Sequence, residues 1–555
     1  MKNMKENTRD RSTVFIKALS GRAGICNLLG KNEEALSDLR DAIRKGEELG
    51  DPAVLAGPKY ELSAVLFSLS RIDDAAKEAA EAMELFGKTG DKKGEAQCLS
   101  NIGYAFRVKG EFDKALEYYE RSIGLQREVG DRIGLATNLN NIGRVHSLKN
   151  DNDKALEYFE NAFGMYGELN YLPGLSTVHA NIGFVLQSRR EYAAALEHYE
   201  KGLAIQMKIG DVQGQAFQYN NMAYSLKRMG KSVPAGRFFR KALDLFRKTG
   251  YLQGVGMALH NIAGIYADRQ KFRMALSCYE EAVRIFNKVG DSKGEAMSAF
   301  NAALNSEKLG DLRSAEKSSK HSLELCDMMK DAYGTVFNLN LLAGLLLERK
   351  DLMGSAALCE KAISLCAGIK LNKDLAIAKR TLGNVRSEFE DYERAEAEFR
   401  ESIEMFSAMN MTENAIGTKL DYARMNIRRF RSGRGTKENI EEAMAFAEEA
   451  LVFSTKGNYA ALKGKAILAG AVSEFEKMKT EGQVNEKRLQ TLFEQAINIF
   501  ERFKASRFMA DALREYAQMM RYAGETEIAD ALENRARKIG SRRSACPVPL
   551  EKKGK

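Results

Sequence analysis

The 555-residue sequence contains only six prolines and no tryptophan. Proline interrupts the interior of a helix because it lacks the backbone N–H and its ring clashes with the preceding turn. A chain with so little proline is therefore predicted to be mostly helical. It is also much longer than one hydrophobic core usually supports, so it either holds several domains or grows by repetition.

Cysteine is scarce and shows no pattern of pairing. The seven cysteines are spread over the chain, and none forms a Cys-x-x-Cys pair. An odd number without regular spacing is not typical of a disulfide framework. We interpret them as reduced, mostly buried thiols.

Long hydrophobic stretches are absent as well. No window approaches eighteen consecutive apolar residues, and the polar start MKNMKENTRDRS leads into no apolar segment. We therefore expect no transmembrane helix and no signal peptide. The prediction is a cytoplasmic protein that does not act at a membrane.

What the sequence does have is charge of both signs. Lys and Arg total 85 against 76 Asp and Glu, which gives a formal net charge of +9. The two signs are interspersed, as on solvated helix faces, so the surplus gives little reason to expect nucleic acid as a partner. The 44% hydrophobic content is that of a folded, globular chain.

A Gly-Asp dipeptide marks a repeat of 40 residues. It stands at 50–51, 90–91, 130–131, 210–211 and 290–291. Glycine suits the left-handed residue that ends a helix, and aspartate suits the N-cap of the following helix. Each dipeptide is therefore predicted to end one helix and to begin the next.

Two further markers lie between these dipeptides. The first is a small residue that follows Asn-Ile, as at Gly103, Gly143 and Gly183. The second is an alanine twelve residues later, followed after four more residues by an aromatic side chain. We predict that the first small residue lies where the two helices of one repeat cross, because a larger side chain would push them apart.

This pattern resembles the tetratricopeptide repeat (TPR), in a form with units of 40 residues instead of the usual length of about 34. The long unit is similar to that of kinesin light chain, of the Pins family of spindle-orientation scaffolds and of bacterial Rap-type regulators. The resemblance covers roughly residues 12–540. It implies an all-α fold, a right-handed α-solenoid superhelix of about thirteen helix-turn-helix repeats.

The spacing of the small residues predicts four parts. They are a flexible N-terminus (1–10), ten regular 40-residue repeats (11–410), three further TPR-like repeats (411–540) and a flexible C-terminal tail (541–555). The last three repeats have longer steps, which we attribute to loop insertions near 428–435 and 479–485. Insertions in such arrays are expected on one edge of the solenoid.

The first of these insertions is rich in arginine, with side chains at Arg428, Arg429, Arg431 and Arg434. We interpret it as a solvated loop. The alternatives are that it holds an acidic partner, a phosphate or RNA, and RNA binding would depend strongly on salt.

The resemblance places a candidate binding site in the concave groove, which the first helix of each repeat lines. Asparagine precedes the small-residue step in six successive repeats, and the equivalent asparagines of kinesin light chain and Pins bind partner peptides. An amide offers donors and an acceptor to a peptide backbone. The resemblance therefore implies a peptide-binding role for Asn101, Asn141, Asn181, Asn221, Asn261 and Asn301. The open alternative is that these amides bond a neighbouring helix.

Further side chains are expected in the same groove. They are Tyr104, Arg107, Arg144, Tyr224, Lys227 and Arg228. The positive members favour an acidic or mixed peptide, and the alternative is that they are solvated helix ends.

No feature of the sequence indicates an enzyme. The GxSxG, GxGxxG and HExxH motifs are absent, and the five histidines lack metal-ligand spacing. We predict no catalytic residue, no metal and no cofactor. The leading hypothesis is a scaffold that binds extended or helical peptide segments of partner proteins. The alternative is a Rap-like signalling regulator whose superhelix is switched by a peptide or a partner. The sequence does not indicate an oligomeric state.

Overall fold

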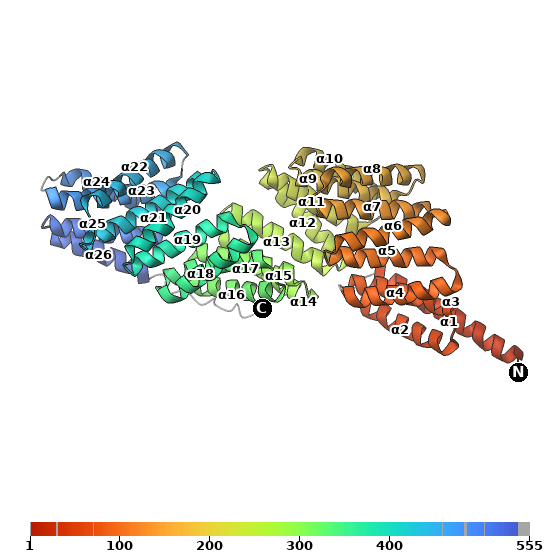
Figure 1. The fold of residues 1–555 in the computed structure, drawn as a ribbon. Helices are drawn as coiled ribbons and strands as arrows, with labels where there is room; N and C mark the ends of the chain where they lie inside the picture. The colour runs from red at the N-terminus through yellow and green to blue at the C-terminus, as the bar shows by residue number, and fades with distance from the viewer. Residues whose placement is uncertain are drawn as a thin grey trace, which may run out of the picture. The chain divides into compact units, whose positions relative to one another are not determined.

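The computed structural model describes residues 2–28, 31–69, 71–457, 459–481, 485–503 and 505–541. These residues form 26 helices and no strand. Figure 1 shows how successive helices lie side by side within each unit. The prediction of an all-α array of about thirteen helical pairs is confirmed. Most of the predicted C-terminal tail (542–555) and part of the second insertion (482–484) lie outside the described residues.

The chain divides into two compact units, residues 1–269 and 270–555. Unit 1 contains α1 (Lys2–Leu28), α2 (Asn32–Leu49), α3 (Pro52–Ser68), α4 (Ile72–Thr89), α5 (Lys92–Val108), α6 (Phe112–Glu128), α7 (Arg132–Leu148), α8 (Asn152–Glu168), α9 (Leu172–Ser188), α10 (Tyr192–Ile209), α11 (Val212–Arg228), α12 (Ser232–Thr249) and α13 (Leu252–Asp268).

Unit 2 contains the other thirteen helices. They are α14 (Phe272–Val289), α15 (Ser292–Leu309), α16 (Leu312–Met328), α17 (Ala332–Glu348), α18 (Leu352–Ile369), α19 (Asn372–Glu388), α20 (Tyr392–Ala408), α21 (Thr412–Arg431), α22 (Lys437–Lys456), α23 (Ala460–Glu481), α24 (Glu486–Arg502), α25 (Ser506–Tyr522) and α26 (Thr526–Ser541). The division therefore falls inside the predicted run of ten regular repeats.

Helix ends recur every 20 residues, because each helix of a regular repeat closes with one left-handed residue. Positive φ angles occur at Gly90, Gly110, Gly130, Asn150 and every twentieth residue onward to Asn410. The predicted glycines end helices, and the aspartates that follow them are N-caps: Asp91 Oδ1, for example, accepts from the Gly94 N–H at 3.0 Å. The Gly-Asp dipeptides, 40 residues apart, thus mark every second helix end.

The small residues of the odd-numbered helices permit close crossing, as predicted. A Cβ at Gly103 would lie 2.8 Å from the Tyr119 ring, and one at Gly143 would lie 2.7 Å from the Phe159 ring. Both rings are fully buried. The glycine therefore makes room for the aromatic residue of the second helix in the same repeat.

Odd-numbered helices form the inner layer of each unit and even-numbered helices the outer layer. Within a unit, successive odd-numbered helices touch one another, whereas no described even-numbered helix touches another even-numbered one. Helices on the inner side of a curved stack lie closer together than those outside. We call the surface of the odd-numbered helices the inner face.

The structure corrects the predictions for two segments. Helix α1 begins at Lys2, so residues 2–10 are helical where we expected a flexible segment. The extra residues of the late repeats mainly lengthen helices instead of forming loops: α21 runs to Arg431 and α23 runs to Glu481. Three of the four arginines assigned to a loop therefore lie in the last turn of α21.

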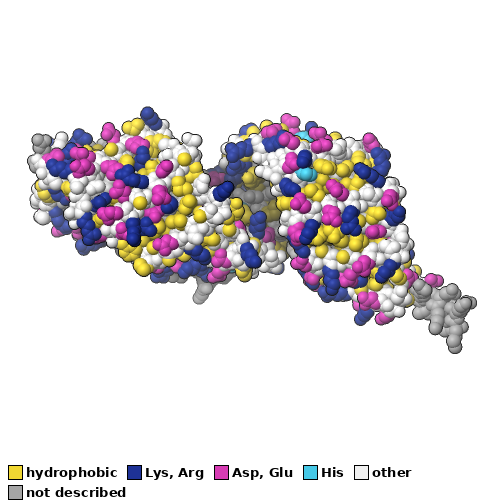
Figure 2. Space-filling model, in the orientation of Figure 1, with side chains coloured by type: hydrophobic (Ala, Val, Ile, Leu, Met, Phe, Trp, Pro, Cys, Tyr) yellow, Lys and Arg dark blue, Asp and Glu magenta, His cyan; other side chains and the backbone are white. Residues whose placement is uncertain are grey.

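One described helix, α18, is long and apolar enough to cross a membrane by length and composition alone. It follows the regular pattern of an outer helix, with Ser355, Cys359, Ala362 and Cys366 buried against the two neighbouring helices in sequence. Charges of both signs are mixed over the visible face of each unit, as the sequence predicts (Figure 2).

Candidate functional site

The six asparagines lie at one register of the odd-numbered helices. Five belong to α5, α7, α9, α11 and α13 of unit 1, and Asn301 belongs to α15 of unit 2. All six side chains are half-buried. The structure therefore places them alike, but it does not give them the same partners.

Two of the asparagines bond a neighbouring helix. Asn181 Nδ2 donates to Asn140 Oδ1 at 2.8 Å, and Asn261 Nδ2 donates to Asn220 Oδ1 at 3.0 Å. Asn140 and Asn220 are buried, with 5% and 6% of their surface exposed. These amide pairs join successive inner helices, which is the structural alternative that the sequence left open.

Two more asparagines also have partners within the chain. Asn101 Nδ2 donates weakly to Ser63 Oγ, at 3.4 Å. Asn301 Nδ2 donates to the Met297 carbonyl of its own helix, at 2.9 Å. Neither amide is fully available to a ligand.

Asn141 and Asn221 differ from the other four. Their side-chain amides form no hydrogen bond with any other described residue. Each of them directly follows, in sequence, the asparagine (Asn140 or Asn220) that accepts a hydrogen bond from the next repeat. The sequence signal is the Asn-Asn dipeptide at 140–141 and 220–221, which alternates with single asparagines. One amide of each dipeptide joins successive repeats, and the other has no side-chain hydrogen bond within the described residues.

Arg107 and Arg144 lie in the same region of unit 1 without an acidic partner. Arg107 is 8% exposed, and its Nε has no hydrogen-bond acceptor. Its guanidinium lies 4.7 Å from the centre of the Tyr104 ring. No carboxylate of the described part of the chain forms an ion pair with either arginine.

The charge of Arg107 influences the pKa of both Arg144 and Tyr119. Burial lowers the pKa of the Arg144 guanidinium, and repulsion by Arg107 lowers it further. Burial raises the pKa of the nearby Tyr119 hydroxyl, while the positive charges of Arg107 and Arg144 act in the opposite direction. Two partly desolvated cations thus repel each other on the inner face, and a bound anion would relieve that repulsion.

The remaining predicted groove residues are less available. Lys227 Nζ lies 3.2 Å from Asp268 Oδ2, and Arg228 Nε donates to Tyr192 Oη at 3.2 Å. Tyr224 is 41% exposed on the same helix, α11. The structure therefore keeps Tyr224 as an open contact surface and assigns both cations to partners within the chain.

Comparison with known proteins identifies the repeats. Family models described as tetratricopeptide repeat match residues 54–128, 99–168 and 254–327, and a second such model matches residues 180–208. The chain therefore contains tetratricopeptide repeats. No curated protein matches the sequence.

Several solved structures are similar to parts of this chain. BtubC from P. vanneervenii is 18% identical over 40% of this chain and 92% of its own length, with a TM-score of 0.36. The quorum sensor NprR from B. thuringiensis is 15% identical over 66% and 99%, with a TM-score of 0.44. The TPR-sensor STAND protein from Pyrococcus horikoshii is 13% identical over 60% and 52%, with a TM-score of 0.46. Similarity at this level does not indicate function.

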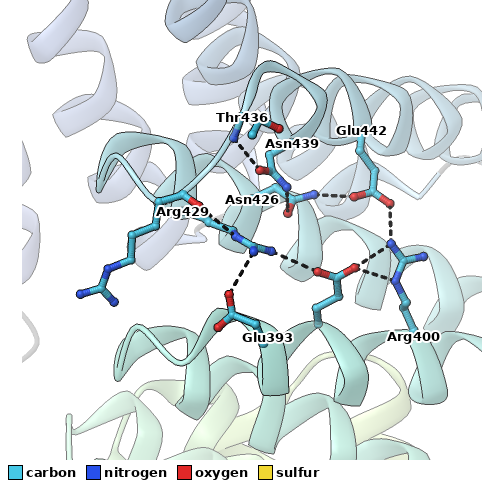
Figure 3. Close-up of polar contacts among 9 residues, drawn as sticks. Glu393, Arg400, Asn426, Arg429, Thr436, Asn439 and Glu442 are labelled. Atoms are coloured by element: carbon cyan, nitrogen blue, oxygen red, sulfur yellow. Dashed lines mark hydrogen bonds and ion pairs between the residues drawn. The ribbon is translucent and has the colours of Figure 1, made fainter.

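The arginine-rich segment at the end of α21 stabilises the TPR array itself. Arg429 lies 3.0 Å from Glu393 and 3.1 Å from Glu396, both on α20. Figure 3 shows Arg429 within a larger polar network that includes Asn426, Asn439 and Glu442. This network joins helices α20, α21 and α22.

The other three arginines of the segment also have acidic partners. These pairs are Arg428 with Glu388 at 2.6 Å, Arg431 with Glu476 at 2.7 Å, and Arg434 with Glu390 at 3.2 Å. The interpretation as a solvated loop therefore holds for residues 432–436, where Arg434 is exposed, and is wrong for the three arginines of α21. The same pairs compete with the alternative of RNA binding, because each guanidinium already has a carboxylate.

Metal and thiol chemistry receive no support from the described residues. Among them, no group of three or more His, Cys, Asp or Glu side chains is arranged to hold a metal. Six of the seven cysteines lie in the described part, all as free thiols, and only Cys278 is not buried.

Proposed function

We propose that the inner face of unit 1 binds an acidic peptide segment of a partner protein, and that the protein acts as an interaction scaffold. The observation that supports this most is the Arg107–Arg144 pair, which lies on the inner face without a carboxylate from the described residues. Leaving a partly buried cation unpaired is costly. A carboxylate of the peptide would offset that cost and form charge-assisted hydrogen bonds.

The two free amides fit the backbone of the same peptide. Asn141 on α7 and Asn221 on α11 are two repeats apart. If neighbouring inner helices lie about 10 Å apart, the amides are separated by about 20 Å, which an extended segment of about six residues spans. Each amide can then donate to a carbonyl and accept from an N–H.

The proposed role is binding alone. We assign no catalytic residue, metal or cofactor to the chain, and we expect partner specificity to come from peptide charge together with contacts to Tyr104 and Tyr224. The peptide is bound in extended form in this proposal, because about six extended residues span the distance between the two free amides.

Selection from a library of random peptides tests the proposal without knowledge of the partner. The immobilised full-length chain is exposed to phage-displayed dodecapeptides, and the enriched sequences are compared with the starting library. We expect an excess of Asp and Glu, and we expect Arg144→Gln to abolish that excess. Arg127→Gln, on the exposed surface of α6, is the matched control and should select the same peptides as wild type. An enriched pool without acidic bias contradicts the proposal.

The second candidate is a regulator that is switched by peptide binding. The division of the array into two compact units favours it, because two such units can rearrange as rigid bodies when a peptide binds. Small-angle scattering with and without a selected peptide would distinguish the two roles. A scaffold keeps its radius of gyration, whereas a switched regulator changes it.

A further inference from the structure

Four cationic side chains line the inner face of unit 2. Arg380 lies on α19, Arg424 on α21, Lys465 on α23 and Arg507 on α25, so that successive inner helices each supply one. We call these four residues the basic cluster. Their repeats were given no binding role by the sequence, because the asparagines had ended at residue 301.

Two carboxylates of the described residues pair with members of the basic cluster. Asp421 Oδ2 lies 2.6 Å from Arg380, and Glu348 of α17 forms an ion pair with Arg507. The second pair links helices that are four repeats apart in sequence. The Arg507 side chain of α25 therefore reaches Glu348 of α17 within unit 2.

The other two cations have no acidic partner in the described part of the chain. Arg424 forms no ion pair there, and Lys465 stacks on the Phe508 ring at 4.0 Å. The pKa of Asp421 is held at about 2, where burial is opposed by the charges of Arg380, Arg424 and Lys465. Four cations thus face two carboxylates, and the cluster carries an excess of two positive charges.

A glycine makes room for this arrangement. Gly417 stands where the preceding repeats carry side chains such as Phe337 and Ile377. A Cβ at Gly417 would lie 3.2 Å from Arg380 Nη1, and the Gly417 carbonyl accepts from Arg380 Nη2 at 3.0 Å. The guanidinium is therefore held beside Asp421, while Arg424 and Lys465 form no ion pair with a carboxylate of the described residues.

We propose that the basic cluster is a second binding site, which takes a run of acidic side chains in a partner polypeptide. The cations are spread over four helices, which suits several carboxylates in a row better than one compact phosphate. On α15 and α17, the next inner helices, Met297 and Phe337 are 51% and 38% exposed. The inner face thus changes from apolar to basic along unit 2. Such a surface is complementary to a polypeptide that carries apolar residues beside a run of acidic residues.

Protection of Lys465 from acetylation tests this site directly, and the result does not depend on peptide binding in unit 1. The full-length chain is treated with trace N-acetoxysuccinimide, with or without hexaglutamate peptide, and acetylation of each lysine is measured by mass spectrometry. We expect hexaglutamate to slow acetylation of Lys465 at least fivefold. The exposed Lys361 on α18 is the control within each sample and should not change.

Control ligands and variants in the same experiment distinguish binding of an acidic polypeptide from binding of other ligands. Hexaglutamine should give no protection, and Arg424→Gln should remove most of the protection by hexaglutamate while the Arg394→Gln control on outer helix α20 retains it. Circular dichroism checks that both variants remain helical, and Arg424→Lys should restore protection if loss of charge is the cause. The proposal is overturned if hexaglutamate leaves Lys465 unprotected, or if tripolyphosphate or an RNA hexamer protects it at lower concentration. Neither outcome affects the proposal for unit 1, which uses no residue of this cluster.

Discussion

Arg380 donates its Nε to Asp421 Oδ2 at 2.6 Å, and this bond joins α19 to α21. Asn140 and Asn181 occupy the same two registers six repeats earlier. The 2.8 Å hydrogen bond between their side-chain amides joins α7 to α9. The array therefore keeps one contact between inner helices while its chemistry changes from neutral amides to an ion pair. Beside the neutral Asn140–Asn181 contact, the side chain of Asn141 has no partner among the described residues. Beside the ionic Arg380–Asp421 contact lie the cations Arg424 and Lys465.

Loss of an amide pair should destabilise unit 1. Asn181→Ala leaves the Oδ1 of buried Asn140 without its donor, which should cost about 1–3 kcal/mol. Asn141→Ala removes a side chain without a partner in the described chain, so it should change stability by less than about 0.5 kcal/mol. Urea denaturation followed by circular dichroism measures both. Equal shifts of the two midpoints would refute the distinction between paired and free amides.

The Asp421 carboxylate should contribute stability that depends on pH. Its pKa is lowered to about 2 from an ordinary value of 3.8, so the contribution is present above about pH 4 and is lost as the pH falls toward 2. Asp421→Asn should therefore destabilise the protein by about 2 kcal/mol at pH 7 and by much less at pH 2.5. Asp113→Asn, on the surface of α6, is the control. A gap between wild type and Asp421→Asn that persists at pH 2.5 would contradict the assignment.

Lys465 should lose its proton unusually early. Burial lowers the pKa of its ammonium group to about 8, and Arg380, Arg424 and Arg507 lower it while Asp421 raises it. Acetylation of Lys465 should therefore level off above about pH 9, and Asp421→Asn should move this profile to lower pH because it removes the one opposing charge. The profile is measured by mass spectrometry over pH 6–11. A rate that rises steadily to pH 11 would show an ordinary lysine.

Crossing glycines should not tolerate a methyl group. A Cβ at Gly143 would lie 2.7 Å from the Phe159 ring and 3.1 Å from the Ala155 carbonyl, so Gly143→Ala should destabilise the protein by about 1–3 kcal/mol. Gly164 lies on the neighbouring outer helix with nothing within 4 Å of its Cβ position. Gly164→Ala should therefore stabilise by up to about 1 kcal/mol. Thermal unfolding of the two variants should shift in opposite directions.

Local signals in the sequence predicted the fold well. The Gly-Asp dipeptides end and begin helices through local backbone conformation and capping, as Gly90 and Asp91 show. Their effect can therefore be predicted without knowledge of the tertiary structure. Small residues such as Gly103 could be assigned because the 40-residue period repeats the same crossing. Helix length was predicted less well. The insertions extend α21 and α23, because a chain that is long enough can add turns instead of forming a loop.

Partners across repeats could not be read from the sequence. Asn181 and Asn140 are 41 residues apart, and Arg431 and Glu515 are 84 residues apart. Their contacts depend on how the helices rotate as they pack, which a repeat pattern does not specify. The six asparagines looked equivalent for the same reason, although only Asn141 and Asn221 lack a side-chain partner within the described residues.

The affinity of a selected acidic peptide tests the central claim most directly. The peptide from the library selection is titrated by fluorescence anisotropy against wild type, Asn141→Ala/Asn221→Ala and the control Asn161→Ala/Asn498→Ala, whose asparagines are exposed on outer helices. Two lost hydrogen bonds of about 0.5–1.5 kcal/mol each should weaken binding by at least about fivefold in the first variant, with helicity and unfolding midpoint unchanged. The control should bind as wild type does. Equal affinity of all three proteins for the peptide would contradict the account of the inner face of unit 1.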